Sequence, residues 1–377
     1  MKIKRFENFF NDGVKRGIIK RVKVVLALVF CYFMISLLPK LSDHPGKTEN
    51  SDYFENFFLS EEYLPLFYSE SYNIKYFGIE KLHPFDSSKY ERVFQDLVNK
   101  EVIKDHQIFR PPRPDDDFLK SFHSEKYLQS LKSSFNLLKI IELKSVLFFP
   151  WRITHRKVLI PMLHQTGGTI LAAKSALKRG WAINLGGGFH HASKNSGSGF
   201  CAYADIAMAI QTLFKTEKEV KNILYIDLDV HQGNGPETDF FHDKRVFIFD
   251  IYNKYIFPRD NLAKKRIDRR VEFGFHVRDR VYLTKLKEGL EEILGLLKFD
   301  LIIYNAGTDI LEGDPLGNWS ITEGGVIKRD EIVFKNAFKF NTPIVMLLSG
   351  GYQKKTARVI SNSIKNLFEK FFNKLSP

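Results

Sequence analysis

The sequence predicts an α/β protein, built as a three-layer αβα sandwich around a mostly parallel central sheet. Short runs rich in Ile, Leu and aromatic residues recur along the chain, and such runs are typical of strands buried on both faces. Segments of helical period lie between them. This alternation indicates right-handed βαβ crossovers that cover both faces of the sheet. No linker or repeat interrupts the pattern after about Tyr63, so we expect a single domain over residues 63–372.

The predicted elements follow in order from the middle of the chain. Each strand is assigned to an uninterrupted apolar run, and each helix to a segment in which apolar residues recur at helical spacing. The strands are expected at 182–185, 223–228, 246–251, 301–304 and 344–348, and the helices at 167–178, 202–214, 282–297, 327–338 and 356–371.

The N-terminal residues differ in composition from this domain. Residues 1–23 carry eight Lys or Arg and two acids, so this basic arm supplies about half of the net charge of +13. The rest of the excess is small for so long a chain, and no direct nucleic-acid binding is expected. The one dense basic cluster in the body, residues 264–270, is interpreted as a solvated face. Residues 40–62 are predicted to be a linker.

Residues 24–39 form an apolar segment, and 24–38 contain no charged residue. Fifteen residues is short for a membrane-spanning helix, which needs about 20. A single-pass anchor is the preferred interpretation, because basic residues precede the segment and no small-x-small cleavage motif follows it. A cleaved signal peptide and a segment that never meets a bilayer are the alternatives.

Metal-binding residue types gather at the ends of predicted strands, where open α/β sheets collect their ligands. Side chains alternate along a strand, so Asp227, Asp229 and His231 project to one side. Asp309, after the 301–304 strand, is the candidate third ligand beside Asp229 and His231. Two carboxylates and one imidazole leave an open coordination position, as in catalytic zinc sites. With two cysteines in the chain, a Cys-rich zinc site is excluded.

The tandem histidines His190 and His191 are the candidate acid and base, because imidazole titrates nearest to neutral pH. Each needs a partner that fixes its tautomer, and Asp227 can serve His190 while Asn234 can serve His191. An Asp partner raises the basicity of a histidine, whereas an Asn partner only orients it. The two histidines are therefore expected to have different roles.

Two glycine-containing segments are candidates for walls of the site. In Gly350-Gly351-Tyr352 the glycines let the backbone and the ring approach a ligand, and Tyr352 can then donate to an oxyanion. A packed loop aromatic is the alternative interpretation of Tyr352. Gly199 and Phe200 belong either to a loop that walls a narrow pocket or to a flexible loop.

These motifs, taken in order, resemble the zinc-dependent histone deacetylases of the arginase/deacetylase fold, and most closely class IV, the histone deacetylase 11 type. The likeness covers some 300 residues, from about Tyr68 to Leu367. The motifs that carry it are His-His-Ala at 190–192, Ile-Asp-Leu-Asp-Val-His-Gln-Gly-Asn-Gly at 226–235, Asn-Ala-Gly-Thr-Asp at 305–309 and Ser-Gly-Gly-Tyr-Gln at 349–353.

The resemblance assigns a role to each candidate residue by position. The implied zinc ligands are Asp229, His231 and Asp309, the catalytic group is His190, His191, Tyr352, Asp227 and Asn234, and the substrate-binding residues are Gly199, Phe200, Phe257, Leu316 and Gly351. A K⁺ ion near Asp227 and Asp250 is also implied. Most family members have Asp at the position of Asn234, and the class IV branch has Asn. Arg259 departs from the family pattern, which leads us to expect Gly.

The resemblance implies hydrolysis of N6-acetyl-lysine or long-chain N6-acyl-lysine in histones or other proteins, in nucleus and cytoplasm. Water would lose a proton to His191 and attack the amide carbonyl, which zinc and Tyr352 polarise. Two alternatives are kept. One is a hydrolase of small acyl-amines such as acetylpolyamines, and the other is a weakly active scaffold protein.

Overall fold

The computed structural model describes residues 28 and 47–372, so the predicted basic arm over 1–23 lies outside the described residues. Seven parallel strands form the central sheet, in the order β2-β4-β9-β8-β5-β6-β7. Their bounds are Leu66–Phe67 (β2), Trp181–Asn184 (β4), Ile223–Asp227 (β5), Val246–Asn253 (β6), Arg269–Phe273 (β7), Leu301–Asn305 (β8) and Ile344–Leu347 (β9). The five strands expected from sequence are all present and all parallel, which confirms the predicted fold class.

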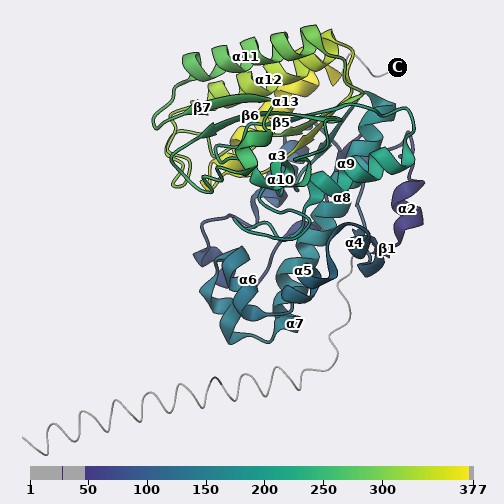
Figure 1. Ribbon diagram of the computed structural model, residues 1–377, viewed down its shortest axis with the longest axis vertical. Helices are drawn as coiled ribbons and strands as arrows, with labels where there is room; N and C mark the ends of the chain where they lie inside the picture. The colour runs from purple at the N-terminus through teal and green to yellow at the C-terminus, as the bar shows by residue number, and fades with distance from the viewer. Residues whose placement is uncertain (1–27, 29–46, 373–377) are drawn as a thin grey trace, which may run out of the picture.

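Helices cover both faces of the sheet (Figure 1). One face carries Ile160–Arg179 (α8) and Asp205–Thr216 (α9). The other carries Lys89–Asn99 (α3), Asp279–Leu296 (α11), Glu323–Lys339 (α12) and Thr356–Lys370 (α13). Alternate strand residues enter the two cores: Ile223 and Tyr225 pack with α8 and α9, whereas Leu224 and Ile226 pack on the opposite side. This is the predicted three-layer sandwich, in a single domain.

Several short elements surround the sandwich. Most of them precede α8 in the chain, and α5, α6 and α7 lie together at one end of the molecule (Figure 1). The helices are Ser51–Glu55 (α2), Asp116–Phe122 (α4), Glu125–Ser130 (α5), Ser134–Ile141 (α6), Trp151–Thr154 (α7) and Asn234–Asp239 (α10), with a π-helical turn at His155–Leu159 (η5). The 3₁₀ turns are Glu70–Tyr72 (η1), Ile79–Leu82 (η2), Asp105–Gln107 (η3), Lys144–Phe148 (η4) and Ala263–Arg266 (η6).

The two edge strands, β2 and β7, were not expected from the sequence. β2 has only two residues, too few to show a period. β7 contains two arginines and a glutamate, so it does not form an apolar run. Charged residues on an edge strand discourage pairing with other chains. The strand also accounts for part of the basic cluster at 264–270.

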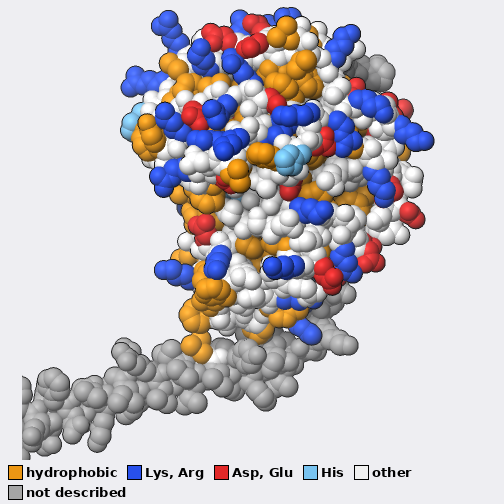
Figure 2. Space-filling model, in the orientation of Figure 1, with side chains coloured by type: hydrophobic (Ala, Val, Ile, Leu, Met, Phe, Trp, Pro, Cys, Tyr) orange, Lys and Arg blue, Asp and Glu red, His pale blue; other side chains and the backbone are white. Residues whose placement is uncertain are grey.

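The basic cluster is paired with acids, and apart from Arg266, which is buried, it lies at the surface as interpreted. The ion pairs are Lys264 with Glu272 (3.7 Å), Arg266 with Asp268 (2.5 Å), Arg269 with Glu292 (2.9 Å) and Arg270 with Glu272 (3.7 Å). On the face shown in Figure 2, Lys and Arg side chains are widely distributed, with Asp and Glu among them.

The linker predicted over 40–62 requires a correction in its described part. Residues 48–49 form strand β1, which pairs in parallel with β3 (Arg113–Pro114), and α2 follows at once. Phe54 in α2 is fully buried and lies 5.0 Å from the ring of Phe118. The sequence pattern did not indicate this helix, because a single short helix with one buried aromatic residue shows almost no periodicity. The packed domain therefore begins before residue 63.

The single-pass anchor expected over residues 24–38 is not supported, which corrects the membrane assignment. Crossing a bilayer requires about 20 helical apolar residues. In the part of the chain that the structure describes, no helix has both the length and the apolar character to do so. Of residues 24–38, only Leu28 is among the described residues.

Truncation of Phe54 tests whether α2 belongs to the domain. We expect Phe54→Ala to lower the free energy of unfolding by about 3–5 kcal/mol, because it empties a fully buried aromatic site. The matched control is Phe58→Ala, four residues later, where the side chain is 69% exposed and the expected change is within about 0.5 kcal/mol. The measurement is equilibrium denaturation by urea. Equal effects of the two substitutions would mean that α2 is peripheral.

Candidate metal and catalytic site

The candidate residues meet at one edge of the sheet, where four adjacent strands end. His190 and His191 follow β4, Asp229 and His231 follow β5, and Asp309 follows β8. The loop with Tyr352 follows β9, which lies between β4 and β8 in the sheet. Backbone hydrogen bonds join neighbouring strand ends, such as Leu228 N to Asn305 O at 3.0 Å. The parallel sheet therefore brings together residues as far apart in the chain as His190 and Tyr352.

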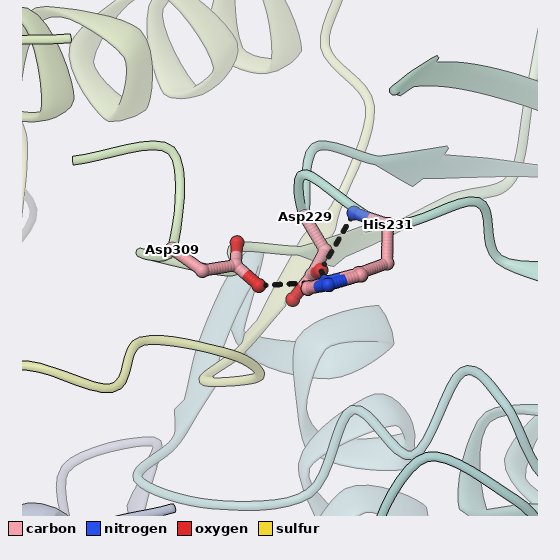
Figure 3. A group of neighbouring side chains, drawn as sticks. All are labelled: Asp229, His231 and Asp309. Atoms are coloured by element: carbon pink, nitrogen blue, oxygen red, sulfur yellow. Dashed lines mark hydrogen bonds and ion pairs between the residues drawn. The ribbon is translucent and has the colours of Figure 1, made fainter. Parts of the chain in front are cut away.

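Asp229, His231 and Asp309 converge as predicted, and all three are buried (Figure 3). One ligand atom from each lies within 4.8 Å of the others. The Nδ1 atom of His231 lies 3.0 Å from Asp229 Oδ1 and 3.0 Å from Asp309 Oδ2. The remaining carboxylate oxygens are fixed by the backbone: Val230 N donates to Asp309 at 2.9 Å and Gly350 N donates to Asp229 at 2.9 Å. Each carboxylate therefore has one oxygen held and one turned toward the imidazole.

This arrangement fits a divalent cation. Burial and the nearby charge of Asp229 raise the pKa of Asp309 to about 7, so the two carboxylates are costly to ionise together without a positive partner. A metal ion supplies that charge. Two carboxylates and one imidazole match a catalytic zinc site with an open position. The residues present thus suit the zinc ion that the resemblance implies.

The two histidines have the different partners that the sequence predicted. The Nδ1–H group of His190 donates to Asp227 Oδ2 at 2.9 Å, and that of His191 donates to Asn234 Oδ1 at 2.9 Å. Asp227 is itself fixed by Tyr225, whose hydroxyl donates to Oδ2 at 2.5 Å. All of these side chains are buried or nearly so.

These partners give the histidines different proton affinities. Burial disfavours the charged form of His190, but the charges of Asp227 and Asp229 outweigh it and raise the pKa of His190 to about 9. Burial, together with the charges of His190 and His231, holds the pKa of His191 well below its usual value. At neutral pH His190 is thus a cation, and His191 is neutral.

The predicted cation position near Asp227 and Asp250 has a distinct environment. Asp250 and Glu237 are fully buried, and their carboxyl groups lie side by side. Gly233 N donates to Asp250 Oδ2 at 3.0 Å, and the carboxyl groups of Asp250 and Glu237 hydrogen-bond to each other, which requires them to share a proton. A cation in place of that proton would balance the charge of the two carboxylates. Glu237 was not among the residues expected there.

Tyr352 lies over the metal-binding residues, with its ring 6.3 Å from that of His231. Burial, and then the charges of Asp309 and Asp229, raise the pKa of Tyr352 well above its usual value, so it stays a hydrogen-bond donor. Asp314 accepts from Tyr352 N at 2.9 Å and from the backbone amides of the turn that follows it. Gly351 has a φ of 122°, a conformation that favours glycine.

A cavity of about 70 Å³ extends from the metal-binding residues. Gly199 and Phe200 line it, as predicted. At Gly199 a Cβ atom would lie 2.4 Å from His191 Cδ2, so only glycine fits against that ring. Phe257 lies outside this lining and packs its ring against His191 at 4.9 Å. Leu316 also lies outside it, half-buried in the turn that Asp314 closes.

Much of the cavity wall is apolar. Side chains from α6, the segment after it, η5 and α8 contribute Ile141, Leu143, Val158 and Met162. The sequence analysis named none of these four residues, because they lie in segments without a recognisable motif.

Lys89 is a site residue that the sequence analysis missed. It begins α3 and is fully buried, and burial lowers its pKa to about 8, although the two metal-site carboxylates oppose the shift. Its Nζ donates to the carbonyl oxygens of Ser349 (2.6 Å), Gly350 (3.0 Å) and Gly351 (3.4 Å). Lys89 therefore holds the loop that carries Tyr352. A lysine in an amphipathic helix gives no sequence signal of this role.

Arg259, where glycine was expected, follows the cis peptide between Phe257 and Pro258. Its φ is 53°, in the left-handed region that glycine occupies most easily. The arginine thus keeps the backbone conformation that a glycine would favour, while adding a charged side chain beside Phe257.

Comparison with known proteins agrees with this geometry. The model of the histone deacetylase domain family matches residues 83–368. Histone deacetylase 2 of Arabidopsis thaliana is 50% identical over 302 residues, which are 80% of this chain and 78% of that protein. Histone deacetylase 1 of Homo sapiens is 29% identical over 295 residues, covering 72% of this chain and 57% of that protein. The crystal structure of the HDA15 HD domain superposes with a TM-score of 0.66 at 18% identity, covering 83% of this chain and 89% of that one, and so shares the fold.

The substitution Asn234→Asp tests the inequality of the two histidines. A carboxylate at this position should raise the pKa of His191, because it stabilises the protonated ring. His191 would then become protonated at a higher pH than in the unsubstituted protein. Titration of the His191 ring protons by NMR measures the shift directly. Asn341→Asp, an exposed position, is the control and should leave His191 unchanged. An unmoved titration in Asn234→Asp would show that the two side chains do not interact in solution.

Proposed function

Because the chain belongs to the histone deacetylase family, we propose that it is a zinc-dependent lysine deacylase that hydrolyses N6-acyl-lysine amides in histones or other proteins. The observation that carries the proposal is the convergence of Asp229, His231 and Asp309 beside two histidines of opposite protonation. A metal-binding triad alone would suit many hydrolases. The neutral imidazole of His191 next to the cationic one of His190 supplies both a base and a stabilising charge.

Each catalytic side chain has one role in this proposal. Zinc, when bound, supplies Lewis-acid chemistry that polarises the amide carbonyl and lowers the pKa of water. His191 takes the proton from the attacking water, since it is neutral and turned by Asn234. His190, held cationic by Asp227, stabilises the negative charge that develops on the carbonyl oxygen. Tyr352 donates a hydrogen bond from its hydroxyl group to the same oxygen. The leaving lysine amine then regains a proton from an imidazole.

The proposal includes two further properties of the protein. The first is a K⁺ ion beside Asp227 and Asp250, where a cation would balance the charge of the buried carboxyl groups. The second is membership of class IV, which rests on Asn234 as the partner of His191. The apolar side chains that line the cavity support binding of an acyl group there, and we extend the proposal to the long-chain acyl groups associated with that class.

An assay of the full-length protein on acetyl-lysine and myristoyl-lysine peptides and on acetylspermidine tests the proposal. We expect hydrolysis of the peptides, loss of activity on chelation and recovery with zinc. Asp229→Ala should lose both zinc and activity. Tyr352→Phe should keep zinc and lose about 10²–10³ in kcat, as expected for one oxyanion donor.

Other outcomes of that assay would point elsewhere. Turnover of acetylspermidine alone would make the protein a small acyl-amine hydrolase. Stoichiometric zinc without turnover of any substrate would make it a scaffold protein. Full zinc occupancy in Asp229→Ala would refute the ligand assignment.

Filling the cavity should change acyl-chain selectivity. Leu143→Trp adds bulk to the apolar wall, so we expect kcat/KM to fall steeply for myristoyl-lysine and little for acetyl-lysine. Leu147→Trp is the matched control, because Leu147 lies four residues later, is 48% exposed and is not part of the cavity wall. If Leu143→Trp left the ratio of the two activities unchanged, the acyl chain would occupy another part of the protein.

A further inference from the structure

Arg329 is a fully buried arginine on α12 that no catalytic role yet explains. It lies on the face of the sheet opposite α8, and its guanidinium reaches the ends of two central strands. The group donates to three backbone carbonyl oxygens: those of Ala306 at 3.2 Å, Leu228 at 3.4 Å and Gly307, the last in a short contact.

These three carbonyl groups lie one to three residues before the carboxylate ligands of the proposed zinc site. Leu228 is bonded directly to Asp229, and Gly307 lies two residues before Asp309. One planar guanidinium thus binds the backbone of both loops. At Gly307 a Cβ atom would lie 2.1 Å from Asp229 Oδ2, which shows how closely the two loops approach each other. A displacement of either loop would therefore change the separation of the two carboxylates.

A buried ion pair holds Arg329 in this position. Its Nε donates to Asp330 Oδ1 at 2.8 Å. The Asp330 carboxylate also accepts from the hydroxyls of Tyr304 and Ser363, each at 2.5 Å. Burying an ion pair is costly unless geometry and further hydrogen bonds compensate for lost hydration. Here every partner is satisfied, so the guanidinium has one fixed orientation.

We propose that Arg329 is a positioning residue that sets the separation of Asp229 and Asp309 and so tunes zinc affinity. The inference rests on the proposed function, since it assumes that these carboxylates bind zinc. The planar fork of arginine suits the role, because its N–H donors point in fixed directions toward the carbonyls of two loops, whereas the donors of a lysine ammonium rotate about a single nitrogen. Groups that orient metal ligands typically change affinity by about 10- to 100-fold when altered.

The chain contains a matched control in Arg266. It is also buried, and its guanidinium also donates to three backbone carbonyls, those of Phe240, Asp243 and Val246. It likewise pairs with an acid, Asp268, at 2.5 Å. None of these partners adjoins a proposed ligand. Replacing Arg266 by Lys thus reproduces the structural damage without touching the metal-binding loops.

The test compares Arg329→Lys with Arg266→Lys in the full-length protein. Zinc affinity is measured by competition with a chromophoric chelator, and ligand geometry by the visible absorption of the cobalt-substituted protein. We expect Arg329→Lys to weaken zinc binding by about 10- to 100-fold and to alter the cobalt spectrum. Arg266→Lys should do neither, while lowering the thermal unfolding temperature to a similar extent.

Equal zinc affinity and identical cobalt spectra in the two variants would overturn the inference and leave the proposed function intact. A wild-type protein that binds no zinc would overturn both. If Arg329→Lys does not fold, Asp330→Asn decides. It keeps Arg329 but removes the neighbouring negative charge, so it should loosen the clamp and weaken zinc binding. Wild-type affinity in a folded Asp330→Asn variant would then refute the role of this ion pair.

Discussion

Two carboxylates of like charge are buried side by side at the carboxyl edge of the sheet, and most of the site follows from this constraint. Asp229 and Asp309 are both inaccessible to solvent, so water cannot screen their repulsion. Backbone amides of Val230 and Gly350 bind one oxygen of each. The other oxygens face His231, where a divalent cation would compensate the charge. Because these carboxylates are buried, a bound metal ion would stabilise the two loops.

The same low-polarity surroundings make two adjacent histidines unlike. His190 and His191 are neighbours in sequence and equally buried, yet the pKa of one is raised and that of the other lowered. The difference comes from their partners. A carboxylate faces His190, whereas an amide faces His191, and the charge of His190 further disfavours a second proton next to it. The charges of Asp227 and Asp229 thus give the two neighbouring imidazoles different proton affinities.

The sequence predicted those parts of the site whose residues lie in short motifs. Strand period and motif order were enough to place Asp229, His231 and Asp309 together, and the partners of both histidines were correct. Prediction failed where the relevant partner is distant in sequence. Lys89 contacts carbonyl groups about 260 residues away, and the cavity wall draws on segments without motifs. The burial of Phe54 was not predicted, because a single buried aromatic residue shows no periodicity. The edge strand β7 was not predicted, because its charged residues interrupt the apolar run.

Lys89 and Arg329 reveal a common principle in the way the site is supported. Each cation enters from a helix, α3 or α12, and binds backbone carbonyls rather than catalytic side chains. Carbonyl oxygens at strand ends lack strand partners, so a buried donor must satisfy them. The fold meets this need with cations, and the charge of Lys89 also acts on the two carboxylates. At Lys89 the requirement to satisfy loop backbone and the requirement to balance buried charge are therefore met by the same residue. Substitution of either cation should consequently alter the proposed metal site, although neither residue is one of its ligands.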